Sequence, residues 1–217
     1  MNVSFGVDKS RLGKQNTFIK FCGLTRPEDV QVVNELKPEF VGFVFWGKSK
    51  RNVTRQQALE LKKALSPEIK AVGVFVDEEP ETIASLISDG IIDIAQLHGS
   101  EAEAYIGRLR ELIGGKPIIK AFVVDTAATI RRIKASSADY LLLDSGKGTG
   151  QTFNWELIKE AGIEKPFFLA GGLDPENVAA AIEALHPFAV DVSSGIETES
   201  HKDPTKMKQF AENARRT

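Results

Sequence analysis

The sequence predicts a single-domain α/β protein with the (β/α)8 architecture of a TIM barrel. Eight short runs of Val, Ile, Leu and Phe each end in a polar or glycine-containing cluster, and a helical pattern follows. Their carboxyl ends recur roughly every 22–30 residues, the length of one βα unit. Continuous apolar strands alternating with helices are typical of a parallel sheet covered on both faces. The expected strands are Phe18–Cys22, Phe40–Phe45, Ala71–Val76, Asp93–Leu97, Pro117–Phe122, Tyr140–Asp144, Pro166–Ala170 and Ala189–Ser193.

Helix-start signals follow several of these strands and support the register. A capping threonine three residues before Glu or Gln predicts a helix amino terminus, and proline is tolerated in a first helical turn. The four starts of these kinds are Thr25–Glu28, Thr54–Gln57, Glu79–Pro80 and Asp174–Pro175.

Composition favours one compact cytoplasmic domain. The chain has 217 residues, 42% of them hydrophobic, which is enough for a core of its own. We assign residues 17–217 to the barrel, and the polar, aperiodic residues 1–16 to a flexible N-terminal extension. The net charge of −2 gives no sign of a nucleic-acid or membrane partner. One cysteine excludes an intrachain disulfide, and we see neither a membrane span nor a signal peptide.

The first expected strand carries a cysteine at its carboxyl end, where barrel enzymes place their chemistry. Lys20 and Cys22 share one face because side chains alternate along a strand. If that face is the interior, Cys22 reaches the top of the barrel and could act as a base or nucleophile, provided that its surroundings lower its pKa. The alternative is a buried structural cysteine.

The second strand leads into a basic loop that contains Lys48, Lys50 and Arg51. Cations at the catalytic end of a barrel could hold an anionic substrate, and an arginine fork suits a carboxylate. An ordinary solvated basic loop is the alternative.

The fourth strand places Gln96 and His98 on one face, with His98 at the carboxyl end. A histidine there could be a metal ligand, a base or a hydrogen-bond donor to substrate. No second histidine or carboxylate stands nearby at ligand spacing, so we expect no metal site.

The sixth strand ends in Asp144 after three leucines. Apolar surroundings favour the neutral form of a carboxyl group, so Asp144 is a candidate proton donor; a cap of the following loop is the alternative. The glycine-rich segment 145–150 lacks the Lys-Ser/Thr ending of a nucleotide-binding P-loop, and we expect it to be mobile.

The last two strands precede a candidate phosphate site. Gly171 and Gly172 follow the seventh strand, and Ser194 and Gly195 follow Asp191 of the eighth. Barrels often bind a phosphate on backbone N–H groups between these two loops, and glycines let the backbone approach the anion. Plain tight turns are the alternative. A phosphate site, a cationic loop, a thiol and an acid together favour proton transfer on a sugar phosphate.

Eight segments, in order along the chain, resemble the phosphoribosylanthranilate isomerases of tryptophan biosynthesis. They are Lys20–Thr25, Val41–Phe45 with Lys48–Arg51, Val72–Val76, Gln96–Gly99, Leu142–Asp144, Gly148–Trp155, Ala170–Asn177 and Val190–Glu197. The resemblance runs from about Thr17 to Arg215. It implies a TIM barrel that binds phosphoribosylanthranilate, with neither metal nor organic cofactor. We expect a monomer or a homodimer, between which the sequence does not distinguish.

The resemblance also implies roles for individual residues. Asp144 is similar to the family's general acid, which protonates the furanose ring oxygen, and Cys22 to the general base, which removes the C2′ proton. Arg51 is similar to the arginine that faces the anthranilate carboxylate. Residues 171, 172, 194 and 195 match the phosphate loops, while His98 and Asp191 stand at substrate-side positions. We expect Lys20 and the phosphate-loop dipoles to lower the Cys22 pKa.

Three departures and three rivals accompany the resemblance. Asn52 and Asn154 replace a frequent aromatic residue and a frequent aspartate, and the segment 197–203 lacks the usual glycine, so the eighth loop is expected to differ in shape. A related barrel of histidine biosynthesis uses an aspartate where this chain has Cys22. Indole-3-glycerol phosphate synthase needs catalytic lysines, for which only Lys20 and Lys120 stand as candidates. The third rival is a non-catalytic phosphate-ligand sensor.

Overall fold

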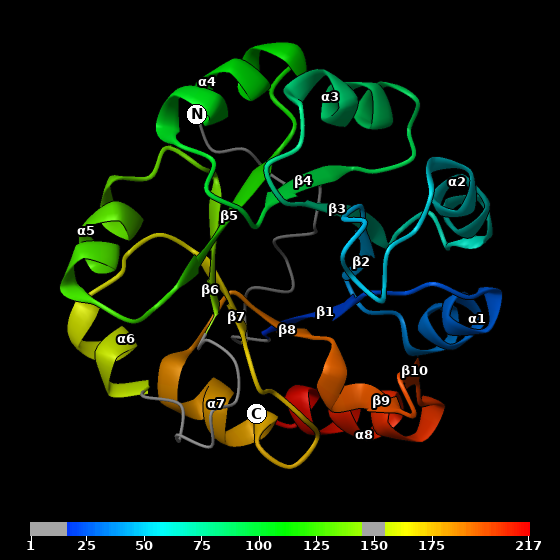
Figure 1. Cartoon of the computed structure of the whole chain (residues 1–217). Helices are drawn as coiled ribbons and strands as arrows, with labels where there is room; N and C mark the ends of the chain where they lie inside the picture. The colour runs from blue at the N-terminus through cyan, green and yellow to red at the C-terminus, as the bar shows by residue number, and fades with distance from the viewer. Residues whose placement is uncertain (1–16, 145–154) are drawn as a thin grey trace.

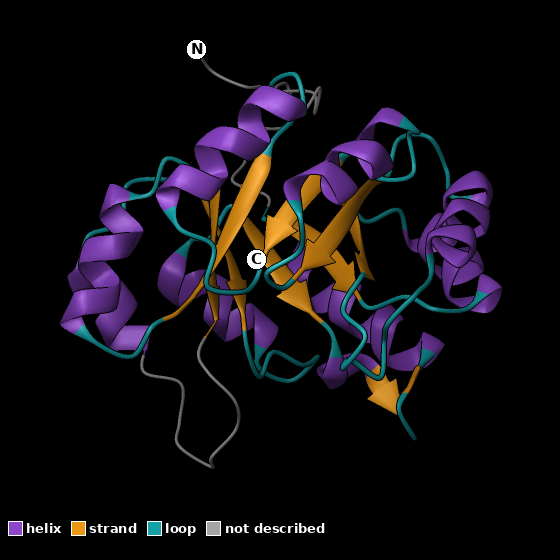
Figure 2. Ribbon diagram, turned by 45° about the horizontal axis from the view of Figure 1, so that its top comes forward, coloured by secondary structure: helices purple, strands orange, loops and turns teal. Residues whose placement is uncertain are grey.

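The eight expected strands form one closed parallel barrel with helices around it (Figures 1 and 2). The computed structural model describes residues 17–144 and 155–217, so the predictions of a flexible segment 1–16 and a mobile segment 145–150 lie outside the described residues. Every strand begins and ends within one residue of its predicted bounds, which confirms the fold class. The strands are β1 (Phe18–Cys22), β2 (Phe40–Val44), β3 (Lys70–Phe75), β4 (Ile94–Leu97), β5 (Ile118–Val123), β6 (Tyr140–Asp144), β7 (Phe167–Ala170) and β8 (Ala189–Val192).

Eight α-helices of the described chain pack on the outward faces of the strands. Two begin where the sequence predicts, at Arg55 and Pro80, and two do not. The first helix begins at Pro27 because the Asp29 carboxylate accepts hydrogen bonds from the backbone N–H groups of Thr25 and Arg26. The Asp174 carboxylate forms a turn before the seventh helix instead of capping it. The helices are α1 (Pro27–Leu36), α2 (Arg55–Ala64), α3 (Pro80–Ser88), α4 (Glu103–Leu112), α5 (Ala127–Ala135), α6 (Trp155–Ala161), α7 (Val178–Leu185) and α8 (Pro204–Arg215).

The barrel interior is aromatic at its amino end and polar at its carboxyl end. Five rings fill the amino end, with contacting ring centroids 5.0 to 6.4 Å apart: Phe18, Phe40, Tyr140, Phe168 and Phe188. Two residues further along β1 and β8, the same face presents Lys20 and Asp191, and Asp144 ends β6 on the face that Tyr140 begins. Alternation along the strands therefore concentrates the polar interior groups at one end.

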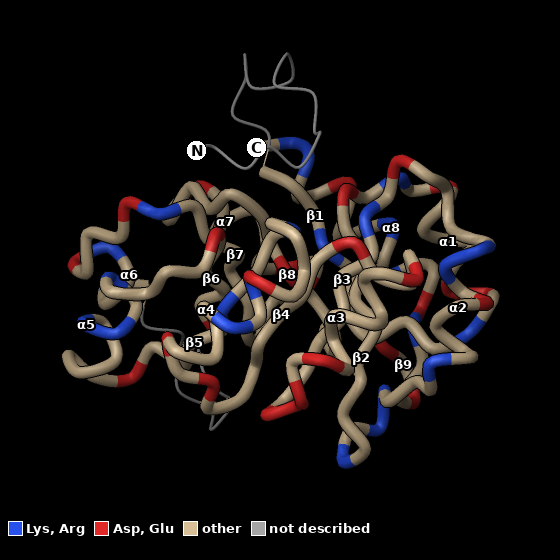
Figure 3. Tube along the Cα trace, turned by 90° about the horizontal axis from the view of Figure 1, so that it is seen from above, with Lys and Arg blue, Asp and Glu red and all other residues tan. Residues whose placement is uncertain are grey.

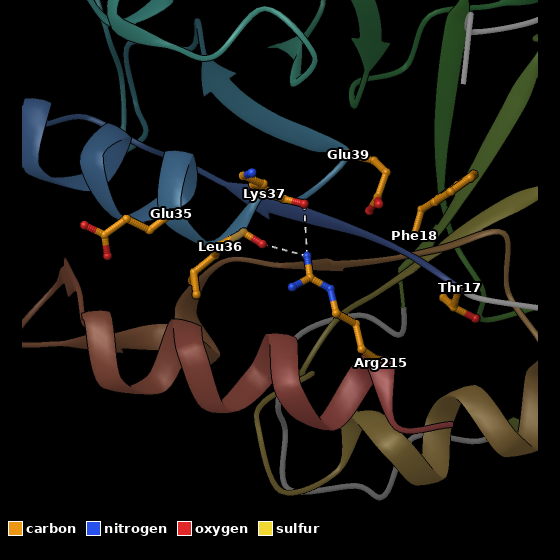
Figure 4. A pocket seen from close by; sticks show the side chains of 7 residues that line it. All are labelled: Thr17, Phe18, Glu35, Leu36, Lys37, Glu39 and Arg215. Atoms are coloured by element: carbon orange, nitrogen blue, oxygen red, sulfur yellow. Dashed lines mark hydrogen bonds between the residues drawn. The ribbon is translucent and has the colours of Figure 1, made fainter. Parts of the chain in front are cut away.

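A pocket of about 570 Å³ lies at the other end of the barrel (Figure 4). Arg215 partly closes it by donating hydrogen bonds to the carbonyl oxygens of Leu36 and Lys37. The residues that line this pocket lie at the start of β1, just before β2, or at the ends of α1 and α8. The pocket is therefore separate from the strand ends that carry the predicted chemistry.

Positive and negative residues are interspersed over the chain trace (Figure 3). Of the helices in residues 17–144 and 155–217, none has both the length and the apolar character that a bilayer crossing demands.

The loop after β8 forms a short hairpin that the sequence did not predict. A 3₁₀ turn, η2 (Ser194–Ile196), leads into β9 (Glu197–Thr198), which pairs antiparallel with β10 (His201–Lys202). The two connecting residues, Glu199 and Ser200, have φ angles of 51° and 65°. Both lie in the left-handed region, which costs non-glycine residues about 1–2 kcal/mol each.

Replacing Ser200 with glycine should stabilise the protein. Glycine adopts the left-handed conformation without a Cβ clash, so we expect a gain of up to about 1 kcal/mol. For a domain of this size, that corresponds to a rise in Tm of about 2–4 °C in thermal unfolding. Ser200→Ala, which keeps the Cβ, should give no such rise. An unchanged or lower Tm for Ser200→Gly would contradict the strain argument.

Candidate active site

The carboxyl ends of four strands bring the predicted site residues to one end of the barrel. Cys22 ends β1, Asp144 ends β6, Asp191 lies in β8, and His98 follows β4. The His98 Nε2 and the nearer Asp144 carboxylate oxygen, Oδ2, are 3.9 Å apart. Asp144, Asp191 and Lys20 all act electrostatically on His98. The structure therefore gathers groups that are up to 171 residues apart in sequence.

A buried ion pair lies beneath the cysteine. The Lys20 ammonium donates to both Asp191 oxygens at 2.9 and 3.0 Å, and the two side chains are 0% and 8% exposed. Burial lowers the pKa of Lys20, but the Asp191 carboxylate and the neighbouring Cys22 together outweigh it and raise this pKa above its ordinary value. Asp191, predicted as a substrate-side group, is thus held by Lys20 across the β1–β8 ladder.

The surroundings of Cys22 favour the neutral thiol over the thiolate. Burial raises its pKa, and Asp191 raises it further, while Lys20 and Lys202 act in the opposite direction without overcoming burial. Lys20 thus acts in the predicted direction, but the desolvation of a buried sulfur exceeds its attraction, so the net shift of the Cys22 pKa is upward. Any base chemistry at Cys22 requires a change in this balance when substrate binds.

Titration of the empty protein should reveal this raised pKa. Because burial favours the neutral thiol, ultraviolet thiolate absorbance should develop only above the ordinary cysteine value of about 8.5. Cys22 is the single cysteine of the chain, so subtracting a Cys22→Ser titration isolates its signal. Burial raises the pKa of Tyr140 to about 12 and that of Tyr105 still further, and the same subtraction removes the tyrosine signals. A thiolate midpoint near or below neutral pH would show that Lys20 dominates.

Gly42 leaves the space that the cysteine sulfur occupies. It is the β2 partner of Cys22 in the ladder, and a Cβ at Gly42 would lie only 2.7 Å from the Cys22 Sγ. Gly42→Ala must therefore displace the sulfur. A shift of about 1 Å in a catalytic group can cost about 10²-fold in kcat. We expect a loss of this order with the fold intact by circular dichroism. Unchanged kcat would mean that the sulfur position is not critical.

The surroundings of His98 favour its neutral form, and its Nε2–H donor is directed toward Asp144. Burial lowers the pKa of His98, although Asp144 and Asp191 act to raise it. The Nε2 of Gln96 lies 3.1 Å from the His98 Nδ1. With the amide in this orientation, Nδ1 accepts, and the ring proton is on Nε2, toward Asp144. The side chains of His98 and Asp144 are 35% and 25% exposed, so both can be reached from outside.

Arg51 is linked to the site by Glu197 and Lys202, two residues whose roles the sequence did not reveal. Its Nε and Nη2 donate to the two oxygens of Glu197 at 2.6 and 2.7 Å, and Lys202 donates to the same carboxylate at 2.7 Å. Burial favours the neutral acid, but these cations hold the Glu197 pKa at about 2. Glu197 stands in a family-like segment, whereas Lys202 follows it in the altered loop and carries no motif of its own.

The loops after β7 and β8 lie against each other at the predicted phosphate site. Gly171 and Gly172 have φ angles of 88° and 66°, which favour glycine. A Cβ on Gly195 would collide with the Leu173 carbonyl oxygen, so glycine permits this close approach. Ser194 begins the 3₁₀ turn η2. The four predicted phosphate residues thus stand on two loops in contact.

Lys120 does not face the barrel interior. It points away from the side of β5 that carries Ile119 and Ala121, and pairs with Glu101 at 2.8 Å, both side chains being nearly fully buried. It also donates to the Gly99 carbonyl oxygen. Because Lys20 is held by Asp191 and Lys120 by Glu101, these lysines are unsuited to the paired catalytic role that the rival synthase needs.

Comparison with known proteins agrees with this geometry. The family model for N-(5'phosphoribosyl)anthranilate (PRA) isomerase matches residues 19–213. A relative of that name from Thermoanaerobacter sp. (strain X514) is 45% identical over 199 residues, covering 91% of this chain and 97% of the relative. A crystal structure of phosphoribosyl anthranilate isomerase with reduced 1-(o-carboxyphenylamino)-1-deoxyribulose 5-phosphate has a TM-score of 0.81 at 37% identity, covering 93% of this chain and all of that one. Mutually generated monomers of the dimeric enzyme from Thermotoga maritima give 0.79 at 36% identity, covering 91% of this chain and 98% of theirs.

Proposed function

Because the chain belongs to the N-(5'-phosphoribosyl)anthranilate isomerase family, an isomerase family of tryptophan biosynthesis, we propose that Cys22 and Asp144 are its proton-transfer pair. The observation that carries this proposal is their placement. They stand at the same end of the barrel, on strands β1 and β6, and Gly42 leaves room for the sulfur. A small substrate bound between these strands meets a base and an acid from different directions.

The proposed reaction is an Amadori rearrangement. Asp144 gives a proton to the furanose ring oxygen, and the C1′–O bond breaks to leave a Schiff base. The Cys22 thiolate then removes the C2′ proton, and the electron pair neutralises the iminium nitrogen to form an enolamine. Tautomerisation, in which C1′ takes up a proton and the C2′ hydroxyl loses one, gives 1-(2-carboxyphenylamino)-1-deoxyribulose 5-phosphate. Proton exchange with solvent returns Asp144 to the acid and Cys22 to its starting form, so substrate and product differ by no net proton or electron.

The thiolate must form when substrate is bound, with the thiol proton released to solvent, since burial otherwise favours the thiol. Ring opening provides the physical reason. The Schiff-base nitrogen is cationic, and a cation close to a thiol favours its ionised form. The base is thus strongest at the step that needs it.

The two ends of the substrate carry anions, and the site offers a partner for each. Arg51 binds the anthranilate carboxylate, and the backbone at Gly171, Gly172, Ser194 and Gly195 binds the phosphate. Around the closed barrel, the loop after β2 lies on one side of the line that joins β1 and β6, and the loops after β7 and β8 lie on the other. Together they hold the sugar across the top of the barrel.

His98 and Asp191 support the reaction from substrate-side positions. The His98 Nε2–H supplies a neutral hydrogen-bond donor next to Asp144. Asp191 fixes Lys20 beneath the cysteine, and its carboxylate remains within electrostatic reach of His98. Neither group is assigned a proton-transfer step.

Cytoplasmic location and assembly as a monomer or homodimer stay predictions. The relative from Thermotoga maritima is described as dimeric. Light scattering coupled to size-exclusion chromatography separates the two states for this chain.

A fluorescence assay on phosphoribosylanthranilate generated in situ tests the proposed site. We expect wild-type turnover, and loss of turnover in the double variant Cys22→Ser/Asp144→Asn while a reduced product analogue still binds. Turnover by the double variant within tenfold of wild type would overturn the assignment of the pair. No turnover by the wild-type protein would leave a different sugar phosphate, or a phosphate-ligand sensor.

A further inference from the structure

The guanidinium of Arg51 is held side-on by the carboxylate of Glu197. The pair uses the Nε–H and one N–H of Nη2, at 2.6 and 2.7 Å, out of five guanidinium donors. The donors left for a second carboxylate are those of Nη1 and the remaining one on Nη2, at the end of the fork. Glu197 therefore fixes the plane of the guanidinium without occupying its outer edge.

Glu197 is itself held by the hairpin. Lys202 is its direct cross-strand partner in the β9–β10 ladder, and their side chains are 2% and 9% exposed. The Lys202 ammonium also donates to the Ser193 carbonyl oxygen at 2.9 Å, and the Ser193 hydroxyl donates to the Cys22 carbonyl oxygen at 3.1 Å. One continuous set of contacts thus runs from the outer arginine to the cysteine at the end of β1.

The charge balance of this set leaves it attractive to anions. Two cations, Arg51 and Lys202, share the single negative charge of Glu197, so the three groups carry a net positive charge. A lone Arg51 on an exposed loop would have the same charge but would sample many side-chain conformations, and a ligand would have to immobilise it. The pairing with Glu197 removes that cost before the ligand arrives.

We propose that Glu197, fixed by Lys202 in the hairpin of loop eight, is a positioning residue that presents the outer edge of Arg51 to the substrate carboxylate. This inference rests on the proposed function, in which Arg51 binds that carboxylate. It assigns to the altered segment 197–203 a role in the affinity for the anthranilate part of the substrate.

Two ligands separate positioning of Arg51 from a general structural role. One is the reduced product analogue, 1-(2-carboxyphenylamino)-1-deoxyribitol 5-phosphate, and the other is the same compound without the ring carboxylate. Titration calorimetry on Glu197→Gln should show about tenfold weaker binding of the first ligand, the order expected when a ligand must immobilise an arginine, and unchanged binding of the second. Glu199→Gln makes the same charge change at the exposed turn of the hairpin and should alter neither affinity.

A mutant cycle with Arg51→Met identifies the route of the effect. If Glu197 acts through Arg51, Glu197→Gln should have no further effect on carboxylate-ligand binding in the Arg51→Met background. Equal loss of both ligands, or full additivity in the cycle, overturns the positioning role. If Arg51→Met alone leaves both affinities unchanged, the proposed function of Arg51 fails instead. Should Glu197→Gln fold poorly, Glu197→Asp keeps the charge next to Lys202, and its shorter side chain should give the same selective loss.

Discussion

Replacing Cys22 with alanine is expected to lower kcat by about 10³- to 10⁴-fold, the upper part of the range that a positioned general base supplies. The sulfur ends β1 inside the barrel, and Gly42 reserves its space, so alanine removes the base and leaves little else changed. Because Cys22 makes no contact assigned to substrate binding, KM should stay within a few-fold of wild type. Steady-state kinetics with the fluorescence assay measure both parameters.

Cys22→Ser is the informative companion variant. Serine keeps the shape of the side chain, but its hydroxyl is a far weaker acid than a thiol and does not ionise near neutral pH. A base role therefore predicts that serine is nearly as inactive as alanine, whereas a packing role predicts that serine restores activity. Retention of wild-type kcat by either variant, with a normal Tm, would remove Cys22 from the mechanism.

The strands, and the polar groups at the carboxyl end of the barrel interior, could be predicted from the sequence. Both follow from the pattern of residues along each strand, on which side chains alternate between the two faces. Continuous apolar runs fixed the eight strand positions within one residue, and a polar residue at the carboxyl end of such a run falls at the catalytic end of the barrel. The positions of Cys22 and Asp144 at that end could be predicted in this way. Their identification did not require knowledge of any contact between strands.

Other features depend on contacts that a one-dimensional pattern does not contain. The ion pair of Lys202 with Glu197 follows from the register of a two-residue turn made without glycine, and no sequence signal marked that turn. The direction of the Cys22 pKa depends on the balance between burial and the nearby ammonium of Lys20, and only the packed structure gives the burial. Arg51 was expected to contact the substrate. Its protein partner on loop eight, Glu197, lies 146 residues away along the chain.

Asp144→Asn should reduce kcat by about 10³-fold, within the range expected for loss of a general acid. Asparagine keeps the size of the side chain and its contact distance to His98, but it has no acidic proton to give to the ring oxygen. Ring opening then leaves an alkoxide without a proton donor. Substrate affinity should change little, since Arg51 and the phosphate loops supply the anion contacts. Single-turnover kinetics on the fluorescence assay should show the loss in the chemical step.

A control substitution outside the barrel interior tests whether the loss of kcat is specific to Asp144. Asp125→Asn is the same substitution on an exposed residue after β5, at the same end of the barrel, and should keep wild-type kcat. If Asp144→Asn keeps its activity as Asp125→Asn does, His98 is the remaining candidate proton donor next to the sugar, because its Nε2 lies beside the Asp144 carboxylate. Burial lowers the pKa of His98 below its ordinary value of 6.5, so a protonated histidine acting as the acid would make kcat fall with rising pH on the acidic side of that value. The pH profile of Asp144→Asn therefore decides which of the two neighbouring groups opens the ring.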